Sequence, residues 1–199
     1  MHTIRGLVVG IAFVVVGSAG EFAAERYTVM VIPHQRYSSV AVEEMGREAS
    51  AILSHTSVDV RLRIGYTREA FDGTLVVVNL RGRCDMDAGP PKAQVGPLGW
   101  THSENGRLLP FADLACESIR GAVQSAQPPG NRLHANAILG RAMGRVLAHE
   151  LYHIAGATFK HGRDGVAKAA LSPENLTAAH LDLDPADVKT IQNRQQGSR

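Results

Sequence analysis

The chain has 199 residues, a length that suits one domain with a hydrophobic core, and it contains no internal repeat. Its formal net charge is only +2, and no cluster of lysine and arginine with interleaved aromatic residues is present. We therefore expect no nucleic-acid partner and predict a monomer.

The N-terminal segment has the layout of a secretory signal peptide. A short polar start that contains Arg5 precedes an apolar run, Gly6 to Val16, and then small residues, Gly17 to Gly20. The apolar run is short for spanning a bilayer. We predict a signal peptide over residues 1–20, cleaved after Ala19 or Gly20, and a single domain over residues 21–199. The mature protein is expected to be exported, either periplasmic or secreted, without membrane attachment.

Export bears on the two cysteines, Cys84 and Cys116. In an oxidising compartment they can form a disulfide, which would stabilise the fold by about 3–4 kcal/mol in the chain-entropy model. The alternative is a pair of buried free thiols. The sequence favours pairing but leaves both options open. Neither cysteine has a C-x-x-C partner, so no cysteine zinc site is indicated.

The N-terminal half predicts a strand, a helix and two further strands. Arg26 to Pro33 is rich in β-branched residues, which is typical of a strand. A helix capped by Ser38 or Ser39 runs to about Ser54. The alternation over residues 58–64 predicts a half-buried strand, and the apolar run at 74–80 predicts a central one.

The C-terminal half predicts a surface loop, a hairpin and several helices. The hairpin turns at Asn105-Gly106, because this pair adopts positive φ cheaply. The expected elements are a loop at 85–98, a hairpin over 100–116, a short helix at 118–125, a long helix at about 134–154, and two helices that begin at Ser172-Pro173-Glu174 and Asp184-Pro185. This order predicts an α+β fold with a mixed or mostly antiparallel sheet packed on helices.

The long helix carries His149-Glu150-Leu151-Tyr152-His153, the pattern H-E-x-x-H. Residues four apart lie on one face of a helix, so His149 and His153 can direct two imidazoles at one point. Zinc binds neutral imidazole readily, and Glu150 can act on the water that fills the open coordination position. We predict that the two histidines bind Zn²⁺ and that Glu150 is the catalytic base.

The hydrophobic pattern of this helix supports the prediction. Its apolar residues form one broad arc, with Glu150 near the middle and both histidines near one edge. A carboxylate on the buried side of a helix is costly unless it is paired or close to a metal. Arg145, Ala148 and Tyr152 fall on the opposite side, which we predict to be polar, so we expect no catalytic role for Tyr152.

A third zinc ligand is expected beyond the two histidines. Gly156 can end the helix in a left-handed conformation, and His161 can then return towards the metal. The alternative third ligand is Glu174, which is also explained as an acid in the first turn of a helix. His180 is a weaker option. The remaining histidines lack ligand spacing and are expected to be surface or packing residues: His34, His55, His102 and His134.

The motif, with Gly156 three residues after His153, resembles the zincin metallopeptidases and among them the metzincin group, whose pattern is H-E-x-x-H-x-x-G-x-x-H. The stretch is also similar to exported bacterial proteins of unassigned function. The chain departs from the group in two places. Phe159 stands where the third histidine is expected, with His161 two residues later, and Ala167 stands where the methionine turn would place its methionine. Gly165 still permits the turn.

The resemblance and the residues together predict a single zincin-like catalytic domain over residues 21–199, with a central H-E-x-x-H active-site helix. They predict an exported zinc-dependent metallopeptidase that hydrolyses peptide bonds, with zinc-bound water activated by Glu150. The cofactor would be Zn²⁺ and the partner a peptide or protein substrate, lying antiparallel along the edge of the 100–111 hairpin. The alternative is a non-catalytic exported module in which a degenerate zincin site stabilises the fold or binds a partner. A fourth protein ligand such as Glu174 would favour this alternative, because hydrolysis needs an open coordination position.

Overall fold

The computed structural model describes residues 24–66, 70–92, 96–127 and 134–197, so the predicted signal peptide lies outside the described residues. The strands form one five-stranded sheet in the order β2-β1-β3-β5-β4. Their bounds are β1 Glu25–Pro33, β2 Val58–Ile64, β3 Thr74–Arg81, β4 Gly99–Glu104 and β5 Arg107–Ala115.

The sheet is mixed, but mostly parallel. β1 pairs in parallel with β2 and β3, and β3 with β5, whereas β4 alone runs antiparallel to its neighbour β5. Of the two predicted alternatives, the mixed sheet packed on helices is confirmed and the mostly antiparallel sheet was wrong. The reason lies in the connections between the strands. α1 joins β1 to β2, and a connecting segment returns the chain to the same end of the sheet before each further parallel strand.

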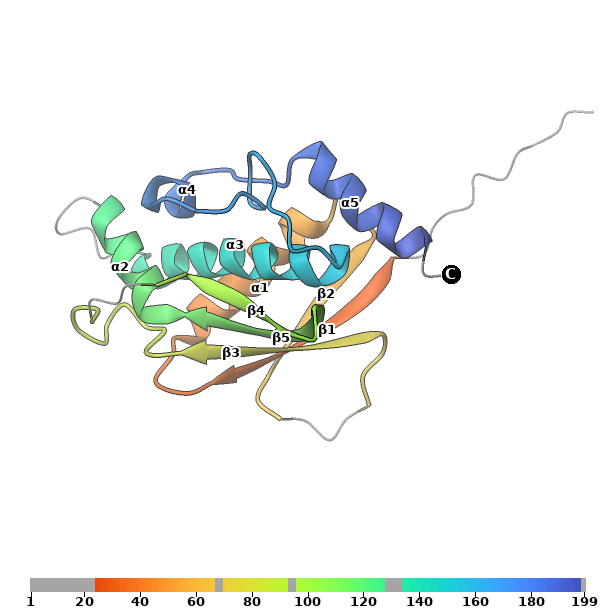
Figure 1. Ribbon diagram of the computed structural model, residues 1–199. Helices are drawn as coiled ribbons and strands as arrows, with labels where there is room; N and C mark the ends of the chain where they lie inside the picture. Colours follow the sequence, from red (N-terminus) through yellow and green to blue (C-terminus); the bar gives the residue numbers. More distant parts are fainter. Residues whose placement is uncertain (1–23, 67–69, 93–95, 128–133, 198–199) are drawn as a thin grey trace, which may run out of the picture.

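Within the described ranges, five helices accompany the sheet: α1 Ser39–Leu53, α2 Cys116–Ala126, α3 Ala135–Gly156, α4 Pro173–Thr177 and α5 Pro185–Gln196. Figure 1 shows them on one side of the sheet, with α4 and α5 beyond α3. The predicted caps of α1, α4 and α5 are present, since Ser38, Ser172 and Asp184 each accept a backbone N–H of the first turn. None of the helices in the described ranges is long and apolar enough to cross a membrane.

The core lies between the sheet and the pair α1 and α3. Alternate residues of the strands face these helices and are fully buried, as in β1 with Val29 and Val31 and in β3 with Val76 and Val78. Helices α1 and α3 approach closely at Gly140, where an added Cβ would overlap the carbonyl oxygen of Ala41. This contact fixes the position of α3, and with it the histidines, relative to α1.

Helix α3 is enclosed on nearly all sides. Arg145 and Ala148 are 0% exposed and Tyr152 is 3% exposed, so the prediction of a polar side was wrong. The cause is tertiary, because α3 contacts α1, α4 and α5 as well as the sheet strands β4 and β5. The buried guanidinium of Arg145 donates to Glu48 of α1 at 2.7 Å and to the carbonyl oxygens of Asn175 and Ala178 around α4.

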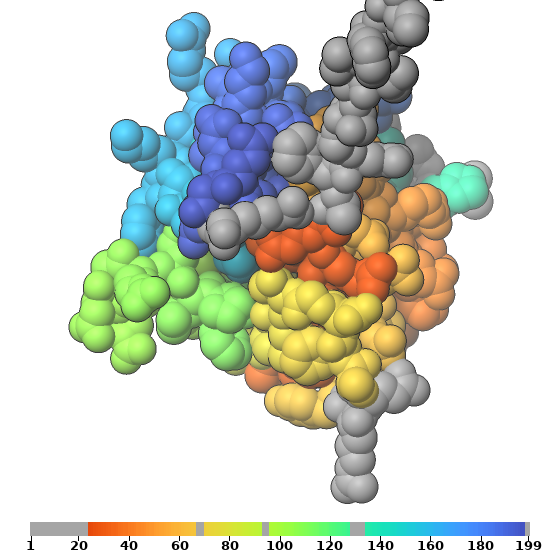
Figure 2. Space-filling view, turned by 90° about the vertical axis from the view of Figure 1, so that its right-hand side faces the viewer, coloured from red at the N-terminus to blue at the C-terminus, as the bar shows by residue number. Residues whose placement is uncertain are grey.

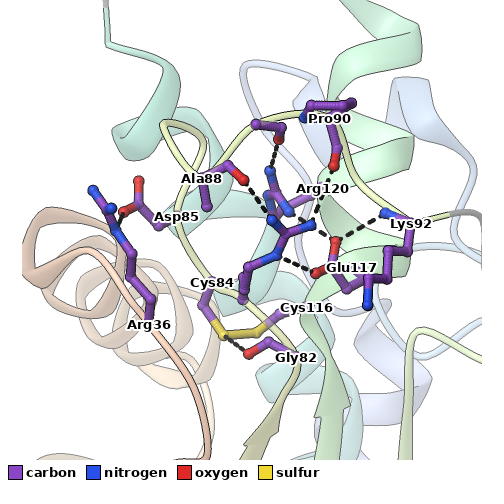
Figure 3. A network of polar contacts seen from close by, with 12 residues as sticks. Arg36, Gly82, Cys84, Asp85, Ala88, Pro90, Lys92, Cys116, Glu117 and Arg120 are labelled. Carbon is purple, nitrogen blue, oxygen red and sulfur yellow. Dashed lines mark hydrogen bonds and ion pairs between the residues drawn. A yellow bond between two sulfur atoms is a disulfide. The ribbon is translucent and has the colours of Figure 1, made fainter.

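A disulfide and a buried carboxylate fasten the connection that follows β3 to the start of α2 (Figure 3). Cys84 is bonded to Cys116, the pairing that the sequence favoured. Glu117 accepts hydrogen bonds from Arg120, from Arg83 at 2.8 Å and from the backbone of Lys92 at 3.1 Å. Although burial pushes the pKa of Glu117 upward, these partners outweigh it and lower the pKa. The connection leads from this anchor to β4.

The close approach of α1 and α3 gives a direct test of the packing. Gly140→Ala should lower the free energy of unfolding by about 1–3 kcal/mol, because its methyl group has no room against α1. Gly121→Ala is the matched control, since the nearest atom to its new Cβ, Pro91 Cγ, is 3.9 Å away. That change should be neutral or stabilising by up to about 1 kcal/mol. Urea denaturation measures both, and equal effects would contradict the packing.

Candidate metal centre and active site

Three histidines converge at the C-terminal end of α3. His149 and His153 lie one turn apart on the helix, and the chain then reverses so that His161 returns to them. The candidate ligand atoms of the three residues all lie within 4.8 Å of one another. The reversal uses Ala157, at φ 45°, and not Gly156 as predicted. Gly156 is instead buried against α5, where its missing side chain leaves room for Thr190.

Backbone carbonyls determine which ring nitrogen of the two helix histidines is free. Nδ1 of His149 lies 2.8 Å from the carbonyl oxygen of Val166, and Nδ1 of His153 lies 2.7 Å from that of Thr158. A carbonyl oxygen can only accept, so each Nδ1 carries the ring proton. In a neutral imidazole the lone pair then sits on Nε2. Burial lowers the pKa of His149 to about 4 and also lowers that of His153, so both rings are neutral at pH 7.

The two free nitrogens point at one another. Nε2 of His149 and Nε2 of His153 are 3.1 Å apart, and neither has a proton to share with the other. The lone pairs of these two nitrogens repel each other unless a cation is bound between the two nitrogens and a third ligand atom. Neighbouring ligands of tetrahedral zinc, at bond lengths of about 2.05 Å, are about 3.3 Å apart. The spacing of these two nitrogens and their neutral state therefore fit Zn²⁺, while the ligand atoms of all three histidines lie within 4.8 Å of one another.

The segment from Ala157 to Lys168 both contributes His161 and holds the other two rings, since it contains Thr158 and Val166. A turn with Gly165 at φ 68° occupies the position of the expected methionine turn, and Val166 donates to the carbonyl of Asp182 at 2.9 Å. Ala167, where a methionine was expected, is fully buried. The chain therefore turns at this point with alanine at residue 167.

Glu150 lies against β4. Its carboxylate is 3% exposed and accepts a hydrogen bond from the Thr101 hydroxyl at 2.8 Å. β4 comes this close because residue 99 is glycine: an added Cβ would lie 2.7 Å from Val146 and 2.8 Å from Glu150 Oε1. Burial raises the pKa of Glu150 to about 7, against the opposing effect of the Thr101 hydrogen bond. A carboxylate with a pKa near neutrality is suited to accept and return a proton.

The histidines and Glu150 open into one cavity of about 610 Å³. One wall is the strand β4 with the residues before it, and the other is the segment that follows α3. Figure 2 shows these two parts, the green hairpin and the light blue segment, projecting on the same side of the molecule. Apolar side chains dominate the lining: Pro97, Leu98, Trp100, Leu108, Val146, Phe159 and Leu171.

A second polar cluster, which the sequence did not indicate, steadies β4 from the other side of the sheet. Asp113 of β5 is 2% exposed and binds His102 of β4 at 3.0 Å and Arg81 at 3.2 Å. Burial alone would raise the pKa of Asp113, but these partners lower it. β4 has a register shift between Thr101 and Ser103, so His102 lies at an irregularity in the strand. The pair holds β4 to β5 beside the residue that contacts Glu150.

The other candidate ligands do not join the histidine cluster. Glu174 and His180 are exposed, and neither belongs to the His149–His153–His161 group, which among the described residues is the one group of three or more candidate ligands that could hold a metal. Ser172, the cap of α4, lowers the pKa of Glu174, in keeping with a first-turn acid. Tyr152 faces α5, where its hydrogen-bonding neighbour is Asp187. The sequence missed this partner because nothing local connects the two residues.

Comparisons with known proteins give a fold but no close relative. No protein-family model and no curated protein matches the chain. Among solved structures, the chain is similar to the crystal structure of archaemetzincin from Methanopyrus kandleri, with a TM-score of 0.52 and 13% sequence identity. The match covers 89% of this chain and 99% of archaemetzincin. At this identity the likeness shows the fold alone, and it confirms the predicted metzincin-like α+β architecture.

The contact between Thr101 and Glu150 predicts an effect on stability. Thr101→Val keeps the shape of the side chain but removes the donor to a buried carboxylate, so it should lower the free energy of unfolding by about 1–2 kcal/mol. Thr101→Ser retains the hydroxyl and is the control that should lose less. Urea denaturation of the metal-free protein at pH 8 measures both. A valine variant as stable as the parent would contradict the role of this hydrogen bond.

Proposed function

We propose that this protein is an exported zinc-dependent metallopeptidase. The observation that carries the proposal is the convergence of three histidines beside a buried glutamate at the wall of an open cavity. His149, His153 and His161 would bind the zinc, and Glu150 would be the catalytic base. Zinc, when bound, supplies a Lewis acid that acidifies water and polarises the scissile carbonyl. The metzincin-like fold supports this assignment.

Other residues transfer the proton and hold the catalytic and ligand side chains in position. Glu150 accepts a proton from the attacking water and delivers it to the leaving amine, for which its pKa near 7 is suited. Thr101 holds Oε2 of Glu150, and Oε1 lies beside Gly99, a residue of the cavity lining. The carbonyls of Val166 and Thr158 keep the histidine rings in the tautomer that directs Nε2 inward.

The substrate would be an extended peptide. β4 is at the end of the sheet, so among the described strands it has a neighbour, β5, on one side only. A peptide can pair with the free edge of β4, and residues 96–101 bring that edge into the cavity. The apolar lining favours substrates with a bulky apolar side chain next to the scissile bond.

The non-catalytic alternative is the weaker account. A closed structural zinc site requires four protein ligands, whereas the group within the described residues has three and opens into a cavity. A structural site would also give no reason for burying Glu150 beside it, where burial makes its charged form costly.

Replacement of the proposed base tests catalysis separately from zinc binding. Glu150→Gln should retain zinc, because Glu150 is not a proposed ligand, and should lose at least about 100-fold in the hydrolysis of a quenched fluorescent peptide library. Elemental analysis gives the zinc content, and chelator-treated protein gives the background. Full activity in the variant would reject the role of Glu150. A parent that binds zinc but cleaves nothing would favour the non-catalytic alternative.

A further inference from the structure

The third histidine is held differently from the first two. His149 and His153 are fixed by a rigid helix and by the hydrogen bonds of their Nδ1 atoms. His161 lies on an irregular segment and is exposed. Within the described residues its ring has no hydrogen bond to a backbone carbonyl like those of His149 and His153. The ring of His161 contacts the other two imidazoles, and its position relative to them depends on the backbone around it.

That backbone rests on a buried carboxylate of α5. Gly162, the residue after His161, lies so close to Asp187 that an added Cβ would overlap the carboxylate atom Oδ2. Asp187 is 5% exposed, and this Oδ2 has no hydrogen-bond partner within the described part of the chain. A buried carboxylate oxygen without a partner is costly, so its place against Gly162 calls for an explanation beyond packing.

The same carboxylate is tied to the ligand helix. The phenol of Tyr152 is its hydrogen-bonding neighbour, and Tyr152 is 3% exposed and precedes His153. The Tyr152–Asp187–Gly162 bridge thus joins a residue adjacent to one proposed ligand to a residue adjacent to another. It connects α3, α5 and the segment that carries His161. None of the three side chains or backbone groups is a candidate zinc ligand.

We infer that Asp187, held by Tyr152, is a positioning residue for His161. Its carboxylate supports the backbone at Gly162 and sets the distance of the third imidazole from the other two. Glycine is favoured at residue 162, because a side chain there would force either the segment or the Asp187 carboxylate to move. The inference rests on the proposed zinc site and adds to it a specific determinant of metal affinity.

The test is a double-mutant cycle on zinc affinity, measured in the full chain by competition with a chromophoric chelator. Asp187→Asn should weaken zinc binding by about 10-fold or more, as loss of outer-shell support does at other zinc sites. In a His161→Ala background the same change should alter affinity by less than about twofold, because the residue through which Asp187 acts is gone. Equal losses in both backgrounds, or no loss in the parent, would overturn the inference.

Two controls separate this inference from the proposed function. Glu174→Gln is the matched acid-to-amide change in the first turn of another helix, and it should leave zinc affinity unchanged. A loss there, or a parent chain that binds no zinc, would contradict the proposed ligand set itself. Tyr152→Phe removes the hydroxyl oxygen and keeps the ring. If Asp187→Asn lowers the yield of folded protein, Tyr152→Phe replaces it in the double-mutant cycle with His161→Ala. It should weaken zinc binding only where His161 is present.

Discussion

The candidate site depends on two hydrogen bonds between imidazole and backbone. The segment after α3 presents the carbonyl oxygens of Val166 and Thr158 to Nδ1 of His149 and His153. These bonds leave both Nε2 lone pairs facing inward, 3.1 Å apart and without protons. The same segment brings His161 to the third side. The nitrogen lone pairs therefore converge at one point. This arrangement is unfavourable without a cation and favourable around one.

The fold supplies the rigid surroundings that such a site needs. The α1–α3 contact at Gly140 sets the position of the ligand helix, and Gly99 lets β4 approach it closely enough for Thr101 to reach Glu150. On the opposite face of the sheet, Asp113 holds His102 and so steadies the same strand. The disulfide between Cys84 and Cys116 anchors the connection that leads to β4. Each of these contacts acts on a wall of the cavity.

The sequence predicted the local features well and the tertiary ones poorly. Helix caps such as Ser38 and Asp184 and the Asn105-Gly106 turn depend on neighbouring residues, so their signals are readable in order along the chain. The direction of each strand depends on crossovers between distant segments, so the sequence left a mixed and a mostly antiparallel sheet as alternatives, of which the structure has the mixed one. Helix α3 was expected to have a polar side, but Arg145 and Tyr152 are buried because partners from other helices surround them.

For the site, the spacing of the histidines in H-E-x-x-H was sufficient to place two of them on one helix face, and proximity was sufficient to favour His161 over Glu174. The supporting residues Thr101, Val166 and Asp187 had no signal, since each acts across a fold contact that no short pattern encodes.

The most direct measurement of the candidate site is a crystal structure of the zinc-loaded protein, with anomalous scattering recorded at the zinc edge. We expect one zinc bound by His149, His153 and His161, with its remaining position open to the cavity. A zinc closed off by a fourth protein side chain, or bound elsewhere, would contradict the account.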